Sequence, residues 1–176
     1  MKLSVLRADP AGNITLFVLT PVPVGDRAGI VAQLMAGSDA EQVGFVCPPL
    51  QGGAGRMEMA GGEFCGNATR AFGMLVSQEQ GSSARILVEV SGCDHPVTVD
   101  VDWSRRTACA QMPLPRSMGR TQVDGRWGTF VDFVGIAHFV VEDVPPSLEF
   151  FEQAEPLFQN IPDLDAYGVM FLDHAA

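Results

Sequence analysis

The sequence predicts an α+β protein, and three observations lead to this fold class. Strand-like segments follow one another, a mostly apolar helix follows Cys65, and Pro113 and Pro115 separate a second set of similar elements. The 176 residues, 47% of them hydrophobic, can bury the core of one domain or of two small halves. We therefore expect one unit over residues 1–115 and a second, incomplete unit over residues 116–176.

The first unit is expected to begin with two strands and a helix. Lys2–Leu6 and Ile14–Val24 are rich in apolar and β-branched residues, and a turn-forming segment lies between them. Asp26 is placed to cap a helix whose apolar residues recur at three- and four-residue spacing until Gly37. Val43–Cys47 then reads as a short buried strand.

The rest of this unit alternates in the same way. Arg56–Met59 is a candidate strand, and the apolar cluster Ala71–Val76 predicts a helix that ends by Gly81. Three segments with the alternation of an antiparallel sheet follow: Arg85–Val90, Val97–Trp103 and Ala108–Met112.

The second unit is expected to contain three strands and one helix. The strand-like segments are Thr129–Val134, His138–Val141 and Val169–Leu172, and Ser147–Glu155 has a helical pattern. Its element content is similar to that of the first unit, which is compatible with a duplicated design.

Charge and hydropathy exclude several classes of partner. The formal net charge is -10, with Lys+Arg 11 against Asp+Glu 21, so the protein would repel a nucleic-acid backbone. No apolar stretch is long enough to span a membrane, and Arg7 and Asp9 stand where a signal peptide would need apolar residues. We expect a cytoplasmic protein with free thiols. A homodimer is a possible oligomeric state.

Cys65 is the residue with the strongest chemical signal. The thiolate is the reactive form of cysteine, and the N–H groups and dipole at a helix N-terminus favour it. Gly61 and Gly62 allow a sharp turn before the helix, Gly66 allows close approach of a ligand, and Asn67 is placed to cap the helix. The same N–H groups could hold a carboxylate. A cysteine here could also serve only as a small buried hydrophobic residue, so the neighbouring residues have to decide between a structural and a catalytic role.

Those neighbours resemble a known family. Glu63-Phe64-Cys65-Gly66-Asn67-Ala68-Thr69-Arg70 resembles the Glu-Met-Cys-Gly-Asn-Gly-x-Arg segment of diaminopimelate epimerases, in which the cysteine is one of two thiol bases. Gly12-Asn13 and Glu41-Gln42 are similar to segments whose asparagine and glutamine face the substrate in that family. Gly135–His138 and Tyr167–Phe171 resemble two later segments, so the likeness covers essentially the whole chain.

The resemblance implies a fold and a set of site residues. The fold has two pseudo-symmetric halves, each a sheet wrapped on a central helix, with a cleft between them, and the second half here is incomplete. Cys65 would be a catalytic base, Asn13 and Gln42 would contact substrate, and the N–H groups of Gly66 and Asn67 would hold its α-carboxylate.

Departures from the family's pattern bear on the substrate. The epimerases use asparagines to bind the distal amino-acid group of diaminopimelate, and here these positions correspond to Met59, Ile136 and Gly168. An apolar group opposite a charged one would cost several kcal/mol. Asn67-Ala68 and the preceding Gly-Gly-Glu-Phe-Cys are closer to the histidine racemases of the same fold. We therefore expect a small, single-headed amino acid as substrate, with histidine as the named candidate.

Racemisation without a cofactor needs a base on each face of Cα. The family's second cysteine lies in an Ala-Cys-Gly-Thr-Gly segment, which this sequence lacks. Cys47, Cys93 and Cys109 do not precede helices and are expected to be structural thiols. We therefore expect the second base beyond Ala176 and an inactive 176-residue form.

Other functions remain as alternatives. These are a diaminopimelate epimerase of lysine biosynthesis, a noncatalytic binding module, and a thiol hydrolase in which His138 assists Cys65. Cys93 and His95 lack a second ligand pair for zinc, and the Gly-rich segment at residues 52–55 lacks the lysine of a phosphate-binding loop. We assign no metal and no cofactor.

Overall fold

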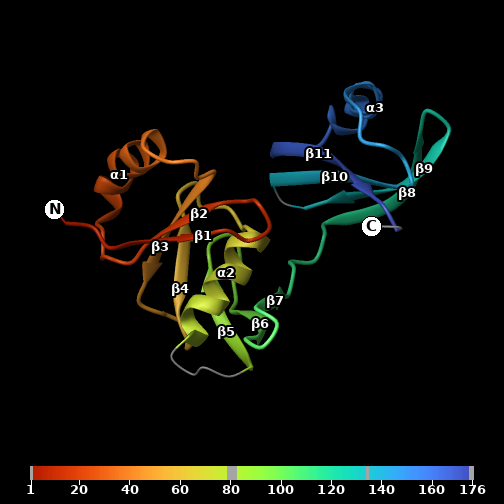
Figure 1. Cartoon of the computed structure of the whole chain (residues 1–176). Coiled ribbons are helices and arrows are strands. Elements are labelled where there is room, and N and C mark those ends of the chain that lie inside the picture. Colours follow the sequence, from red (N-terminus) through yellow and green to blue (C-terminus); the bar gives the residue numbers. More distant parts are fainter. Residues whose placement is uncertain (1, 79–82, 134, 175–176) are drawn as a thin grey trace. The chain divides into compact units, whose positions relative to one another are not determined.

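A seven-stranded sheet and a four-stranded sheet form the framework of the protein (Figure 1). The computed structural model describes residues 2–78, 83–133 and 135–174. The chain divides between Met112 and Pro113 into two units, each of which contains one of the sheets. Both sheets are accompanied by helices, so the predicted α+β class is confirmed.

The seven strands of the first unit follow one another across the sheet in sequence order. β1–β2, β3–β4, β5–β6 and β6–β7 are antiparallel pairs, whereas β2–β3 and β4–β5 are parallel. The strands are β1 (Val5–Ala8), β2 (Thr15–Val18), β3 (Gln42–Cys47), β4 (Arg56–Met59), β5 (Ala84–Val90), β6 (Val97–Asp102) and β7 (Thr107–Ala110).

Helix α2 (Gly66–Ser77) packs against β5, β6 and β7 (Figure 1). Its Phe72 is fully buried beside Phe17 of β2, with ring centroids 6.1 Å apart. A Cβ added to Gly73 would lie 2.5 Å from a methyl carbon of Val99, so only glycine permits the helix to lie this close to β6. This close contact fixes the position of α2 on the sheet.

The opposite face of the sheet carries helix α1 (Val24–Ala36). Val18 of β2 packs in the core beneath α1, whereas its neighbour Phe17 packs in the core around α2. β2 is covered on both faces, which explains its uninterrupted burial. The predicted cap at Asp26 is wrong: α1 begins after Pro23, and Asp26 lies in its first turn.

The second unit is a four-stranded sheet with helix α3 (Leu148–Ala154) and the 3-10 helix η2 (Glu155–Phe158) on its apolar core. Ser147 caps α3 through a hydrogen bond from the Phe150 N–H. β10–β11 is a parallel pair, and the other two pairs are antiparallel. The strands are β8 (Ser117–Val123), β9 (Arg126–Asp132), β10 (Gly135–Glu142) and β11 (Leu164–Leu172).

Several predicted boundaries differ from the structure. β8 was not predicted, because most of its residues are exposed and show no apolar alternation. β9, β10 and β11 each begin earlier than predicted, because a glycine, which is poor in strand propensity, lies among the added residues of each strand: Gly128, Gly135 and Gly168. The predicted ends at Gly81 and Val134 lie outside the described residues.

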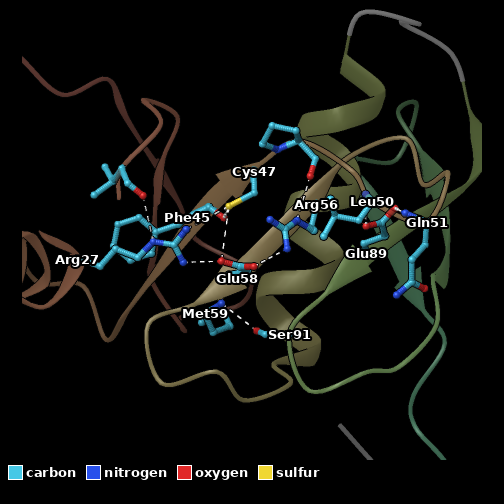
Figure 2. A network of polar contacts seen from close by, with 12 residues as sticks. Arg27, Phe45, Cys47, Leu50, Gln51, Arg56, Glu58, Met59, Glu89 and Ser91 are labelled. Atoms are coloured by element: carbon cyan, nitrogen blue, oxygen red, sulfur yellow. Dashed lines mark hydrogen bonds and ion pairs between the residues drawn. The ribbon is translucent and has the colours of Figure 1, made fainter. Parts of the chain in front are cut away.

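Glu89 connects β5 to the Gly-rich segment after β3. Its carboxylate accepts hydrogen bonds from the N–H groups of Leu50 and Gln51, at 2.7 and 2.6 Å (Figure 2). It accepts a third from the N–H group of Gly53, at 3.0 Å. Burial alone would raise the pKa of Glu89, but the three N–H donors and the nearby Arg56 guanidinium lower it below its ordinary value. The charged carboxylate therefore orders this segment.

We predict that Glu89→Gln lowers Tm at neutral pH by roughly 3–6 °C, because the amide has lost the charge and its NH₂ group faces other donors. Since folding lowers this pKa, the wild-type advantage is complete above the unfolded value of about 4.3 and is lost as the pH falls through the folded value. Thermal unfolding across this pH range checks the effect. Glu152→Gln, on the exposed surface of α3, is the control, and an equal Tm loss in both variants would contradict the prediction.

Candidate active site

Cys65 is the N-cap of α2, with extended backbone angles of φ −127° and ψ 111°. Its sulfur accepts a hydrogen bond from the Ala68 N–H at 3.4 Å. Its carbonyl accepts two more, from the N–H and the hydroxyl of Thr69, both at 2.8 Å. The prediction that Asn67 caps the helix is therefore wrong: Asn67 is the second residue of α2, and the thiol is the cap.

Three amide side chains surround the half-buried sulfur. Nε2 of Gln42 lies 3.3 Å from Sγ of Cys65, and Oδ1 of Asn13 lies 3.9 Å from it. The same Asn13 oxygen accepts from Gln42 at 2.7 Å and from Nδ2 of Asn67 at 3.3 Å. The sulfur thus has N–H donors for its thiolate form and an oxygen that can accept the proton of its thiol form.

The strand pairing explains why distant segments meet at this point. β2 and β3 are parallel, with Thr15 opposite Gln42, so Asn13 and Gln42 lie at the same edge of the sheet. Gln42 also donates to the buried Thr15 hydroxyl at 2.8 Å. The structure therefore brings together Asn13, Gln42, Cys65 and Asn67, all predicted as site residues.

The first turn of α2 offers two further donors. The N–H groups of Ala68 and Thr69 are bonded to Cys65, whereas those of Gly66 and Asn67 have no partner in the described part of the chain. A Cβ added to Gly66 would lie 3.1 Å from the sulfur of Met112, whose side chain is 54% exposed. The side chain that lies against Gly66 is thus a flexible, exposed one, and the two N–H groups are of the kind that bind a carboxylate at a helix N-terminus.

Two charged residues in this network were not predicted as site residues. Asn13 donates to the Glu41 carboxylate at 2.5 Å, and the Arg70 guanidinium donates to the Asn67 side-chain oxygen at 2.5 Å. Both residues belong to segments that resemble the epimerases, but sequence alone gives no contact that would assign them a role.

A separate polar network lies on the α1 face of the sheet (Figure 2). Glu58 of β4 is held by Arg27 of α1 and by Arg56, and the Arg27 hydrogen bond is the main reason for its lowered pKa. Arg27 also lies over the Phe45 ring, 4.7 Å from its centroid. Arg27, Arg56 and Glu58 border a cavity of about 850 Å³, and the network attaches α1 to the sheet.

The remaining cysteines have different surroundings. Cys47 lies in the network of Figure 2, near Arg27 and Glu58, and burial followed by the Glu58 charge raises its pKa. Burial, with the neighbouring Asp94, also raises the pKa of Cys93. Cys109 is exposed on β7. No hydrogen bond of the described residues links these thiols to the side chains around Cys65.

The positions expected to bear on the substrate are distributed over both units. Met59 is only 3% exposed and packs in the core around α2. Ile136 of β10 is 38% exposed. Gly168 of β11 pairs with His138 of β10. Among the described residues, the buried Nδ1 of His138 has no hydrogen-bond partner of normal geometry. Burial lowers the pKa of this side chain, and the nearby Gly168 backbone partly opposes the shift.

Residues 2–78, 83–133 and 135–174 contain neither a candidate metal site nor a candidate membrane-spanning helix. No group of three or more His, Cys, Asp or Glu side chains there could hold a metal ion. No helix in these ranges has the length and apolar character that crossing a bilayer requires.

The α+β fold of this chain is shared by a protein of known structure. A predicted epimerase, PA4716, from Pseudomonas aeruginosa has a similar structure, with a TM-score of 0.55 over 97% of this chain and 68% of that one, at 12% sequence identity. This low identity supports the fold alone.

The chain belongs to the family described as "Histidine racemase CntK N-terminal domain", whose model matches residues 2–176. A histidine racemase of Fusobacterium nucleatum (strain ATCC 25586) is 30% identical over 97% of this chain and 67% of its own length. A histidine racemase of Staphylococcus aureus (strain Mu50) is 36% identical over 48% of this chain and 33% of its own length. The predicted resemblance is thereby confirmed.

We predict that Cys65 reacts with iodoacetamide at neutral pH about tenfold faster than Cys47 and Cys93, because N–H donors surround its sulfur whereas burial raises the pKa of the other two. Mass spectrometry of peptides after timed labelling measures each thiol in one sample, and exposed Cys109 serves as the internal reference. Equal rates for Cys65, Cys47 and Cys93 in the folded protein would contradict the prediction.

Proposed function

We propose that this chain is part of a cofactor-independent amino-acid racemase in which Cys65 moves the α-proton, with histidine as substrate. The observation that carries the proposal is the placement of the Cys65 sulfur at the N-terminus of α2, among the side chains of Asn13, Gln42 and Asn67. Membership of the histidine racemase family and the names of the curated relatives support the choice of substrate.

In the proposed reaction the substrate α-carboxylate binds the free N–H groups of Gly66 and Asn67. The Cys65 thiolate removes the proton from Cα, and the electron pair stays on the substrate as a carbanion beside the helix N-terminus. A thiol on the opposite face then donates a proton to Cα, which inverts the centre. The next turnover needs a net proton return from the first thiol to the second.

We further propose that this second thiol lies outside the 176-residue sequence. The thiols of Cys47 and Cys93 have raised pKa values, Cys109 is exposed, and no hydrogen bond of the described residues joins any of the three to the Cys65 network. The four-stranded unit is proposed as the partial counterpart of the first unit in a pseudo-symmetric fold. Homodimer formation stays a prediction that sedimentation analysis can check.

The test is α-proton exchange and inversion of L-histidine in D₂O, followed by NMR and chiral chromatography. We expect a protein that contains this chain together with the family's second-thiol segment to do both, and the 176-residue form to invert no amino acid. Cys65→Ala in the longer protein should lower inversion by about 10²- to 10⁴-fold, because one base cannot serve both faces of Cα. Diaminopimelate is the comparison substrate, since the alternative epimerase activity would favour it.

Two outcomes would contradict the proposal. Full inversion by the Cys65→Ala protein would show that Cys65 is not the base. An acyl adduct on Cys65 with an activated ester, without exchange of the histidine α-proton, would favour the thiol hydrolase alternative.

Gly66→Ala tests the proposed carboxylate site. The added Cβ would meet only the flexible end of Met112 and, at 3.8 Å, the Phe64 ring, so we expect Tm to change little. The methyl group would obstruct the N–H groups, and we expect KM of the longer protein for histidine to rise about tenfold. Gly29→Ala is the matched control, because a Cβ there meets no atom within 4 Å. An unchanged KM in Gly66→Ala would place the carboxylate elsewhere.

A further inference from the structure

Glu41 and Arg70 each contact one asparagine of the Cys65 network from its outer side. Glu41 is exposed and accepts from Nδ2 of Asn13 at 2.5 Å. Arg70 donates to Oδ1 of Asn67, also at 2.5 Å. No other charged side chain of the described residues forms a hydrogen bond with these two asparagines.

The chemistry of these two contacts determines which way each amide points. A carboxylate can only accept a hydrogen bond, so Glu41 requires the NH₂ group of Asn13 to face it and turns the Asn13 oxygen inward. A guanidinium can only donate, so Arg70 holds the Asn67 oxygen outward and turns its NH₂ group inward. The two inward groups meet as an N–H···O bond of 3.3 Å between Asn67 and Asn13.

The orientation of Asn13 in turn determines what the sulfur meets. With its oxygen inward, Asn13 accepts from Gln42 at 2.7 Å, so Gln42 must present its NH₂ group, which also lies 3.3 Å from the sulfur. That nitrogen carries two hydrogens but lies near three acceptors, including the Thr15 hydroxyl at 2.8 Å. One amide N–H of Gln42 can therefore donate either to the sulfur, when this is a thiolate, or to an oxygen acceptor, when the sulfur is protonated.

We propose that Glu41 and Arg70 are positioning residues, which fix the amide directions of Asn13 and Asn67 so that the Cys65 sulfur faces donors and one acceptor oxygen. The proposal rests on the proposed role of Cys65 as a base. It assigns a function to two charged side chains that need not touch the substrate themselves.

The test compares substitutions that differ only in hydrogen bonding. Glu41→Gln and Glu41→Met have similar length and both remove the charge, but only glutamine keeps an acceptor for Asn13. Arg70→Gln and Arg70→Met form the second pair, in which only glutamine keeps a donor for Asn67. The readout is the iodoacetamide rate of Cys65 at neutral pH in the 176-residue chain, divided by the rate of Cys109 in the same sample.

We expect Cys65 to react about two- to fivefold more slowly in each methionine variant than in its glutamine partner, the size of one net hydrogen bond. The difference at position 41 should disappear in an Asn13→Ala background, because Glu41 would act only through Asn13. The difference at position 70 should likewise disappear with Asn67→Ala. Asp26→Asn, an exposed carboxylate on α1 outside this network, should leave the rate unchanged.

Equal rates within both pairs would overturn the proposal, as would a difference at position 41 that persists in the Asn13→Ala protein. Neither result would affect the proposed function, provided that wild-type Cys65 still reacts faster than Cys47 and Cys93. If Cys65 in the wild-type chain reacted no faster than Cys47 and Cys93, that result would instead contradict the proposed function itself. Thermal unfolding of each variant shows that it is folded, and each pair of variants tests the role of its own residue.

Discussion

The hydrogen bond from the Ala68 N–H to the Cys65 sulfur joins the backbone of α2 to the group that would react. Because the thiol is itself the helix cap, the sulfur cannot leave the helix end without leaving an N–H group unpaired. The two carbonyl contacts from Thr69 hold the same residue from the other side. The conformation of Cys65 is thus set before any substrate arrives, which is the condition that efficient proton transfer requires.

The sheet supplies the rest of the site through strand direction. A parallel β2–β3 pair places the residues that begin both strands at one edge, and this brings Asn13 and Gln42 to the sulfur. A one-residue change of register would turn Gln42 to the other face, toward α1. The two-sided burial of β2 strongly disfavours such a change, because Phe17 and Val18 belong to different cores.

The site was more predictable from sequence than the fold boundaries. The resemblance of segment 63–70 to the epimerases predicted Cys65 and Asn67 as site residues, and two further similar segments predicted Asn13 and Gln42. The structure brings these four residues together. The cap was misassigned because asparagine is the commoner capping residue, whereas here a thiol does this. β8 was missed because its exposed residues carry no apolar period, and strand pairing with β9 alone defines it. Glu41 and Arg70 could not be assigned, since amide direction depends on contacts between distant segments.

The missing side chain at Gly73 has a consequence for protein engineering. Gly73 lies eight residues, about two turns, beyond Cys65 on the same helix, and the approach of α2 to Val99 depends on it. An alanine at this position would push the rigid helix away from β6 and move its capped end with it. The position of the Cys65 sulfur relative to the amides of Asn13 and Gln42 therefore depends on a buried contact that no ligand would reach. A directed-evolution library confined to the lining of the site would miss that contact.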